Sequence, residues 1–83
     1  MNILITGGTS GLGKATVKLL QKDEHQIYFS YLANEQFSAV AKELEVTYPN
    51  VKGEALNFCE EESVNAFFEK IAGWDIDVLV NCT

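Results

Sequence analysis

The sequence predicts an α/β fold, in which helices cover both faces of a doubly wound parallel sheet. Short apolar segments typical of buried strands alternate along the chain with segments whose apolar residues recur at helical spacing. A glycine-rich segment, residues 6–13, joins the first such strand to the first such helix. With right-handed crossovers between successive strands, the expected order of the four strands is 3-2-1-4.

The first strand and helix adjoin the glycine-rich segment. Residues 2–6 form a nearly continuous apolar run, as expected for a strand that is buried on both faces. From Leu12 the apolar residues follow a helical stripe, and Ser10 is the expected N-cap. Residues 27–31 are β-branched and aromatic, which predicts the second strand.

The rest of the chain repeats the alternation. Asn34 opens a second helical segment, which Pro49 ends. Residues 51–56 are a weaker third strand, and residues 64–71 have apolar positions at the i, i+3, i+4, i+7 spacing of a third helix. Residues 76–80 are the fourth strand, and its open edge suggests that the chain is truncated.

Composition narrows the class of protein. The 83 residues are 47% apolar and have a net charge of −6, which argues against a nucleic-acid-binding protein. The two cysteines and one histidine lack metal-ligand spacing, so no metal site is expected. No apolar stretch approaches the roughly 20 residues that cross a bilayer, and no leader precedes the first strand. Residues 1–83 are therefore expected to be one cytoplasmic domain.

The segment Thr6-Gly7-Gly8-Thr9-Ser10-Gly11-Leu12-Gly13 indicates a phosphate-binding loop. Glycines permit positive φ in the turn and let a ligand approach the backbone, while the helix N-terminus supplies N–H groups and the positive end of its dipole. Residues 1–22 contain three lysines and no acid. A glycine turn with a purely structural role leaves that charge unexplained, so we expect a pyrophosphate ligand.

A P-loop is one alternative, because residues 8–14 satisfy the pattern G-x-x-x-x-G-K. The next residue, Ala15, lacks the hydroxyl with which a P-loop binds Mg²⁺, and Thr16 lies about 100° further round the helix. A P-loop protein would also be expected to have a metal-binding acid at the end of the fourth strand, and Asn81 occupies that position. A P-loop NTPase is therefore less favoured.

The pattern T-G-x-x-x-G-x-G in residues 6–13, together with the strand ending in residues 77–81, resembles the N-terminal part of the short-chain dehydrogenase/reductase family. The resemblance covers the whole chain. It implies a Rossmann-type sheet, and a homo-oligomeric parent oxidoreductase that transfers hydride between a nicotinamide cofactor and a carbonyl or alcohol substrate. The family's catalytic Ser, Tyr and Lys would follow Thr83, so no catalytic residue is expected here. A non-catalytic dinucleotide-binding or interaction module is the other alternative.

The resemblance also implies which residues bind the cofactor. The expected set lies in the glycine loop or at the ends of strands, and comprises Gly7, Thr9, Ser10, Gly11, Leu12, Gly13, Tyr31, Asn57, Phe58 and Asn81. The loop residues would shape and line the pyrophosphate site, and Asn81 would lie beside the adenosine ribose. Asn57 replaces the family's common Asp and can accept a hydrogen bond from the adenine amino group only without charge.

Cofactor choice depends on the end of the second strand. An acid there would hold the ribose hydroxyls of NAD and repel the 2′-phosphate of NADP, and Tyr31 occupies that position. The neighbouring Ser30 and Leu32 are also uncharged, so NADP is the favoured cofactor and NAD the alternative. Residues 30–35 also resemble the 3-oxoacyl-carrier-protein reductase branch of the family, which mostly uses NADP.

Overall fold

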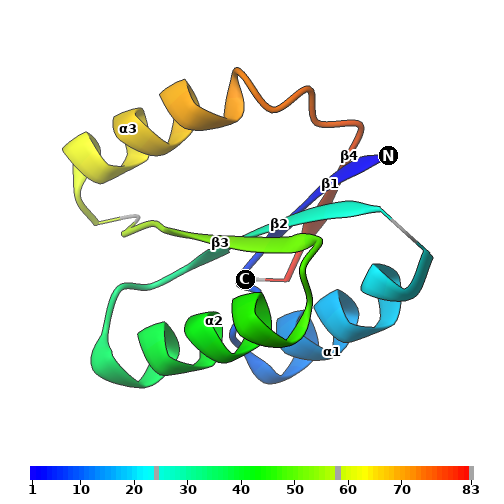
Figure 1. Cartoon of the computed structure of the whole chain (residues 1–83). Helices are drawn as coiled ribbons and strands as arrows, with labels where there is room; N and C mark the ends of the chain where they lie inside the picture. Colours follow the sequence, from blue (N-terminus) through cyan, green and yellow to red (C-terminus); the bar gives the residue numbers. More distant parts are fainter. Residues whose placement is uncertain (24, 58, 83) are drawn as a thin grey trace.

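A computed structural model describes residues 1–23, 25–57 and 59–82 and shows three layers, helix on sheet on helix (Figure 1). Helices α1 (Gly11–Leu20) and α2 (Glu35–Thr47) cover one face of the sheet. Helix α3 (Glu61–Ile71) covers the other face. The predicted α/β class is confirmed.

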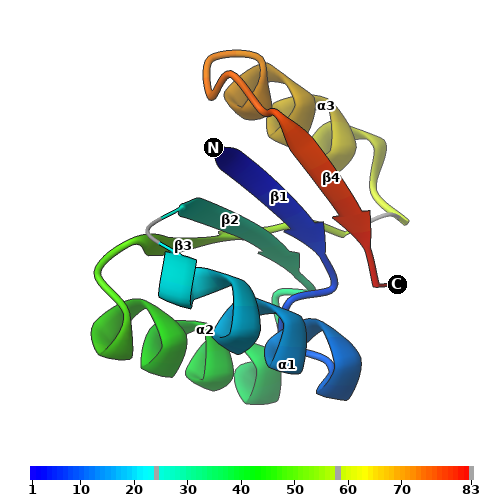
Figure 2. The same cartoon turned by 90° about the vertical axis from the view of Figure 1, so that its right-hand side faces the viewer.

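The sheet has four parallel strands in the order β3-β2-β1-β4, as the sequence predicts. Their bounds are β1 (Asn2–Thr6), β2 (Gln26–Tyr31), β3 (Val51–Ala55) and β4 (Val78–Asn81). The last strand begins two residues later than expected. Thr6 of β1 pairs with Asn81 of β4, and Tyr31 of β2 pairs with Ala55 of β3. The carboxyl ends of the strands therefore meet at one edge, where the loop from β1 enters α1 (Figure 2).

Side-chain caps determine where the first two helices begin. The Ser10 side chain accepts a hydrogen bond from the Gly13 N–H, so α1 starts at Gly11, directly after its predicted cap. Asn34 caps α2 in the same way, through a bond of 2.8 Å from the Phe37 N–H. A short 3₁₀ turn (Gln21–Asp23) follows α1.

The core is divided unequally between the two faces of the sheet. Because successive strand residues point to opposite faces, Ile3 and Ile5 lie on one side of β1 and Leu4 lies on the other. The larger cluster, beneath α1 and α2, buries Ile3, Ile5, Val17, Ile27, Phe29, Ala41, Leu44 and Val51. Among the described residues, the cluster beneath α3 buries Leu4, Leu56 and Phe67.

Helix α3 buries a narrower stripe than the periodicity indicates. Phe67 is buried, but Phe68, which belongs to the same predicted stripe, is 59% exposed. The smaller cluster is extended by Trp74, whose ring stacks on Tyr28 with centroids 4.3 Å apart. Phe67 packs with Leu4 of β1 and with Leu56, which follows β3, whereas Phe68 is not part of this cluster.

Exposed apolar side chains gather at the β4 edge of the sheet. Val78 is 37% exposed and Leu79 is 63% exposed.

In the parts of the chain that the structure describes, no helix is both long and apolar enough to cross a membrane.

Candidate functional site

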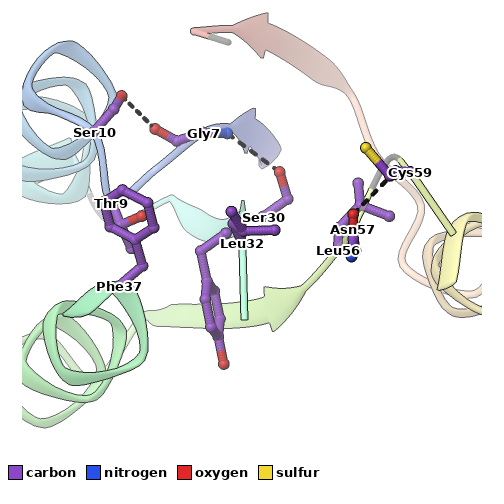
Figure 3. Close-up of a pocket in the computed structure, with 10 residues that line it drawn as sticks. Gly7, Thr9, Ser10, Ser30, Leu32, Phe37, Leu56, Asn57 and Cys59 are labelled. Carbon is purple, nitrogen blue, oxygen red and sulfur yellow. Dashed lines mark hydrogen bonds between the residues drawn. The ribbon is translucent and has the colours of Figure 1, made fainter. Parts of the chain in front are cut away.

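A groove of about 310 Å³ lies at the carboxyl ends of β1, β2 and β3 (Figure 3). Its walls come from the loop after β1, the end of β2, the first part of α2 and the connection from β3 to α3. The lining residues are Gly7, Thr9, Ser10, Ser30, Tyr31, Leu32, Phe37, Leu56, Asn57 and Cys59. In parallel α/β sheets, ligands bind outside the carboxyl ends of the strands, so this edge is the expected place for a site.

The peptide of Gly7 is held on both sides. Gly7 has a φ of 73°, in the left-handed region that favours glycine. Its N–H donates to the Ser30 hydroxyl over 3.2 Å, and its carbonyl accepts from the Ser10 hydroxyl over 2.8 Å (Figure 3). The loop is therefore fixed both to the neighbouring strand β2 and to the start of α1.

The other glycines of the loop differ in their surroundings. A Cβ atom on Gly13 would lie 1.8 Å from the Gly7 carbonyl oxygen, and one on Gly8 would lie 2.4 Å from the Phe29 Cβ. Both glycines are therefore required by close packing. A Cβ on Gly11 would meet nothing within 4 Å. The space beside Gly11, at the N-terminus of α1, is open.

Two backbone donors face this open space at the start of α1. Helix geometry leaves the first N–H groups without intrahelical partners. Ser10 accounts for two of them, because its hydroxyl accepts from Gly13 and its own N–H donates to the Gly7 carbonyl. The N–H groups of Gly11 and Leu12 have no hydrogen-bond partner among the described residues. Free donors, the helix dipole and the open space fit the phosphate oxygens of a pyrophosphate group.

The end of β2 forms an uncharged wall. Burial, and then the nearby Glu45 and Glu54 carboxylates, raise the pKa of Tyr31, so its phenol stays neutral near pH 7. Leu32 and Phe37 supply apolar surface beside it. Neither an acid nor a lysine lines the groove within the described part of the chain.

The far wall of the groove is a turn held by Asn57. Its side-chain oxygen accepts from the Cys59 N–H over 3.0 Å, and its own N–H donates to the Ser63 hydroxyl over 2.9 Å. The side-chain carbonyl predicted to face adenine is therefore already engaged in the turn, and its second lone pair is what a ligand would use. Phe58 lies outside the described residues.

The predicted residues divide into two groups. Gly7, Thr9, Ser10, Tyr31 and Asn57 line the groove. Gly11, Leu12 and Gly13 lie at the adjoining start of α1, and Asn81 ends β4.

Asn81 is positioned by the neighbouring strand. The Thr6 hydroxyl donates to its side-chain oxygen over 2.8 Å, and the two residues are register partners at the ends of β1 and β4. Asn81 therefore lies at the same edge of the sheet as the groove, without lining it.

Five lining residues were not predicted to line the site: Ser30, Leu32, Phe37, Leu56 and Cys59. Four of them lie within four residues of the end of β2 or β3. That position in the sequence could have identified them, because ligands bind at the carboxyl ends of parallel strands. Phe37 is different, because it reaches the groove from the first turn of α2. Its place depends on how the helix packs on the sheet.

Comparisons with known proteins identify the family of the chain. The family described as short chain dehydrogenase matches residues 1–83. The 3-oxoacyl-[acyl-carrier-protein] reductase FabG of Aquifex aeolicus (strain VF5) is 35% identical over 81 residues, covering 94% of this chain and 33% of that protein. The chain spans about a third of the length of the curated relatives that it matches.

Two solved structures resemble the fold closely. The structure titled "ElxO with NADP Bound" has a TM-score of 0.73 and 30% identity, covering 96% of this chain and 33% of its own. BdcA in complex with NADPH has a TM-score of 0.76 and 25% identity, covering 96% of this chain and 30% of its own.

Proposed function

The chain belongs to the short chain dehydrogenase family, and from this premise we propose that residues 1–83 form the dinucleotide-binding part of an oxidoreductase. The parent reaction is hydride transfer between a nicotinamide cofactor and a carbonyl or alcohol substrate. The proposal rests above all on the start of α1, where the Gly11 and Leu12 N–H groups face open space next to the groove. That arrangement suits a pyrophosphate at the carboxyl ends of parallel strands.

Each part of the site has a role in this proposal. The N–H groups of Gly11 and Leu12 bind the pyrophosphate, and the fixed Gly7 peptide and the close-packed Gly13 keep the helix start in place. The adenosine half occupies the groove. The residues proposed to bind it there are Thr9, Ser10, Tyr31 and Asn57. Phe58, which follows Asn57 in the sequence, and Asn81, which would lie beside the ribose, complete the proposed set. When bound, the nicotinamide cofactor supplies or accepts the hydride.

We infer that NADP is the preferred cofactor and NAD the weaker one. No acid lines the groove among the described residues to hold the ribose hydroxyls of NAD, and Tyr31 offers a neutral hydroxyl. The solved structures of ElxO and BdcA carry NADP and NADPH respectively. Both facts favour the phosphorylated cofactor.

The proton-transferring residues are assigned to another part of the parent protein. Tyr31 is the tyrosine that lines the groove, but its raised pKa disfavours loss of its proton and no lysine lines the groove with it. Residues 1–83 therefore bind and orient the cofactor. The relatives are about three times as long as this chain. In this proposal, the part of the parent protein that corresponds to their additional residues binds the substrate, transfers the proton and forms the contacts between identical subunits.

Calorimetric titration of the full-length chain that contains residues 1–83 tests the proposal. We expect NADPH to bind with a micromolar dissociation constant, NADH to bind more weakly, and nicotinamide mononucleotide, which lacks adenosine, to bind weakest. Mg-ATP serves as the competing ligand. Binding of Mg-ATP together with no binding of either dinucleotide would replace the proposal with a P-loop function.

A further inference from the structure

We propose that Ser30 is a positioning residue, whose hydroxyl sets the shape of the pyrophosphate-binding loop by holding the peptide N–H of Gly7. The inference rests on the proposed dinucleotide function and adds a residue that acts through the loop. Ser30 lies on β2, 23 positions along the chain from Gly7.

Ser30 is a buried polar residue with two contacts to the loop. It is 2% exposed and lies at the penultimate position of β2. Its hydroxyl accepts from the Gly7 N–H over 3.2 Å (Figure 3), and its backbone carbonyl accepts from the Gly8 N–H over 2.9 Å. One strand residue therefore holds two successive N–H groups of the glycine loop.

The Gly7 peptide is where such a contact has most effect on the ligand site. The Gly7 carbonyl accepts from both the hydroxyl and the N–H of Ser10, and Ser10 is the N-cap of α1. Gly13 packs so closely on that carbonyl that a Cβ would overlap it. The backbone of Gly7, held at its N–H by Ser30 and at its carbonyl by Ser10, thereby sets where α1 begins and how the Gly11 and Leu12 N–H groups are placed.

The hydroxyl and the backbone of Ser30 can be separated by mutation. Ser30→Ala keeps the carbonyl that accepts from Gly8 and removes the acceptor for Gly7. The Gly7 N–H is partly buried and would be left without its partner, which is unfavourable. We expect the Thr6–Gly7 peptide, which carries this N–H, to turn toward solvent. Because that peptide shares the Gly7 Cα with the carbonyl that supports Ser10, the start of α1 should lose its phosphate-binding geometry.

Ser63 provides a matched control at the other end of the groove. Its hydroxyl also accepts a backbone N–H, that of Asn57, over 2.9 Å. Ser63→Ala therefore makes the same chemical change where the adenosine half is proposed to bind. Both variants are to be titrated in the full-length chain with ADP-ribose, which has a pyrophosphate, and with adenosine, which has none.

Ser30→Ala is expected to weaken ADP-ribose about tenfold and adenosine less than about twofold. Ser63→Ala is expected to weaken both ligands by the same factor. Hydrogen exchange of the Gly7 amide, followed by NMR without ligand, should become faster in Ser30→Ala and not in Ser63→Ala. A general loss of stability would not change the two ligands unequally.

The outcomes separate this inference from the proposed function. If the wild-type chain binds neither NADPH nor ADP-ribose, the proposed function and the inference both fail. If the wild-type chain binds them and Ser30→Ala weakens ADP-ribose and adenosine equally, only the role of Ser30 fails. Unchanged exchange of the Gly7 amide would likewise overturn that role, whatever the affinities.

Discussion

At the scale of single residues, Gly11 and Gly13 are a matched pair in one helical turn. We expect Gly13→Ala to lower the free energy of unfolding by about 3 kcal/mol, because its Cβ would overlap the Gly7 carbonyl. Gly11→Ala should leave stability unchanged or raise it by up to about 1 kcal/mol, because its Cβ meets nothing and alanine favours the helix. In ligand binding, Gly11→Ala should still weaken NADPH about tenfold, by filling the space proposed for phosphate.

Urea denaturation and calorimetric titration measure the two properties separately. Equal loss of stability in Gly11→Ala and Gly13→Ala would contradict the packing argument. Normal NADPH affinity in Gly11→Ala would show that the pyrophosphate lies elsewhere.

The raised pKa of Tyr31 predicts a contribution to stability that is lost at alkaline pH. The folded protein holds the phenol proton more tightly than the unfolded chain does, chiefly because partial burial penalises the charged phenolate. This contribution is complete below the unfolded-chain pKa and is lost as pH rises through the folded pKa. As pH rises above about 10, the melting temperature should therefore fall less in Tyr31→Phe than in wild type. If the melting temperatures of the two proteins fell in parallel as pH rises, Tyr31 would not be the group responsible for the loss of stability.

At the scale of elements, the caps of the helices differ in what they contribute. Asn34 bonds the Phe37 N–H, whereas Glu60, at the start of α3, makes no side-chain capping bond. Asn34→Ala should lower the free energy of unfolding by about 1 kcal/mol, measured by urea denaturation. Asn34→Asp is the control, because it keeps the acceptor and should keep the stability. NADPH affinity should be unchanged in Asn34→Asp, which keeps the capping bond to Phe37, a lining residue of the groove.

At the scale of the whole molecule, the unequal core predicts unequal local stability. Within the part of the chain that the structure describes, α3 covers a cluster with three buried residues, whereas α1 and α2 share one with eight. In native-state hydrogen exchange of the full-length chain, amides of α3 should open at lower free energy than those of α2. Uniform exchange of the two helices would mean that the whole sheet opens as one unit.

A substitution at Phe67 tests the same asymmetry. Phe67→Ala removes the one side chain of α3 that is buried, and we expect a loss of about 3 kcal/mol. Trp74 is the single tryptophan, and its ring makes edge contacts with Phe67, so its fluorescence should shift toward that of an exposed indole. Phe68→Ala is the control and should change both readings much less, because Phe68 is 59% exposed.

Local signals in the sequence determined the order of the elements and the glycine loop. The caps at Ser10 and Asn34, the end of α2 before Pro49 and the alternation of strands and helices all depend on residues within a few positions of each other. Such short-range patterns constrain the backbone before any long-range contact forms. The strand order could then be predicted, because parallel crossovers have one hand.

Only the tertiary structure decided which distant residues meet. The bond between Ser30 and Gly7 and the place of Phe37 in the groove wall join segments that are more than one element apart. The different burial of Phe67 and Phe68 depends on how little of the sheet α3 covers. Helical spacing places both on one stripe, but the width of the buried stripe is set by the opposing surface, which no local pattern contains.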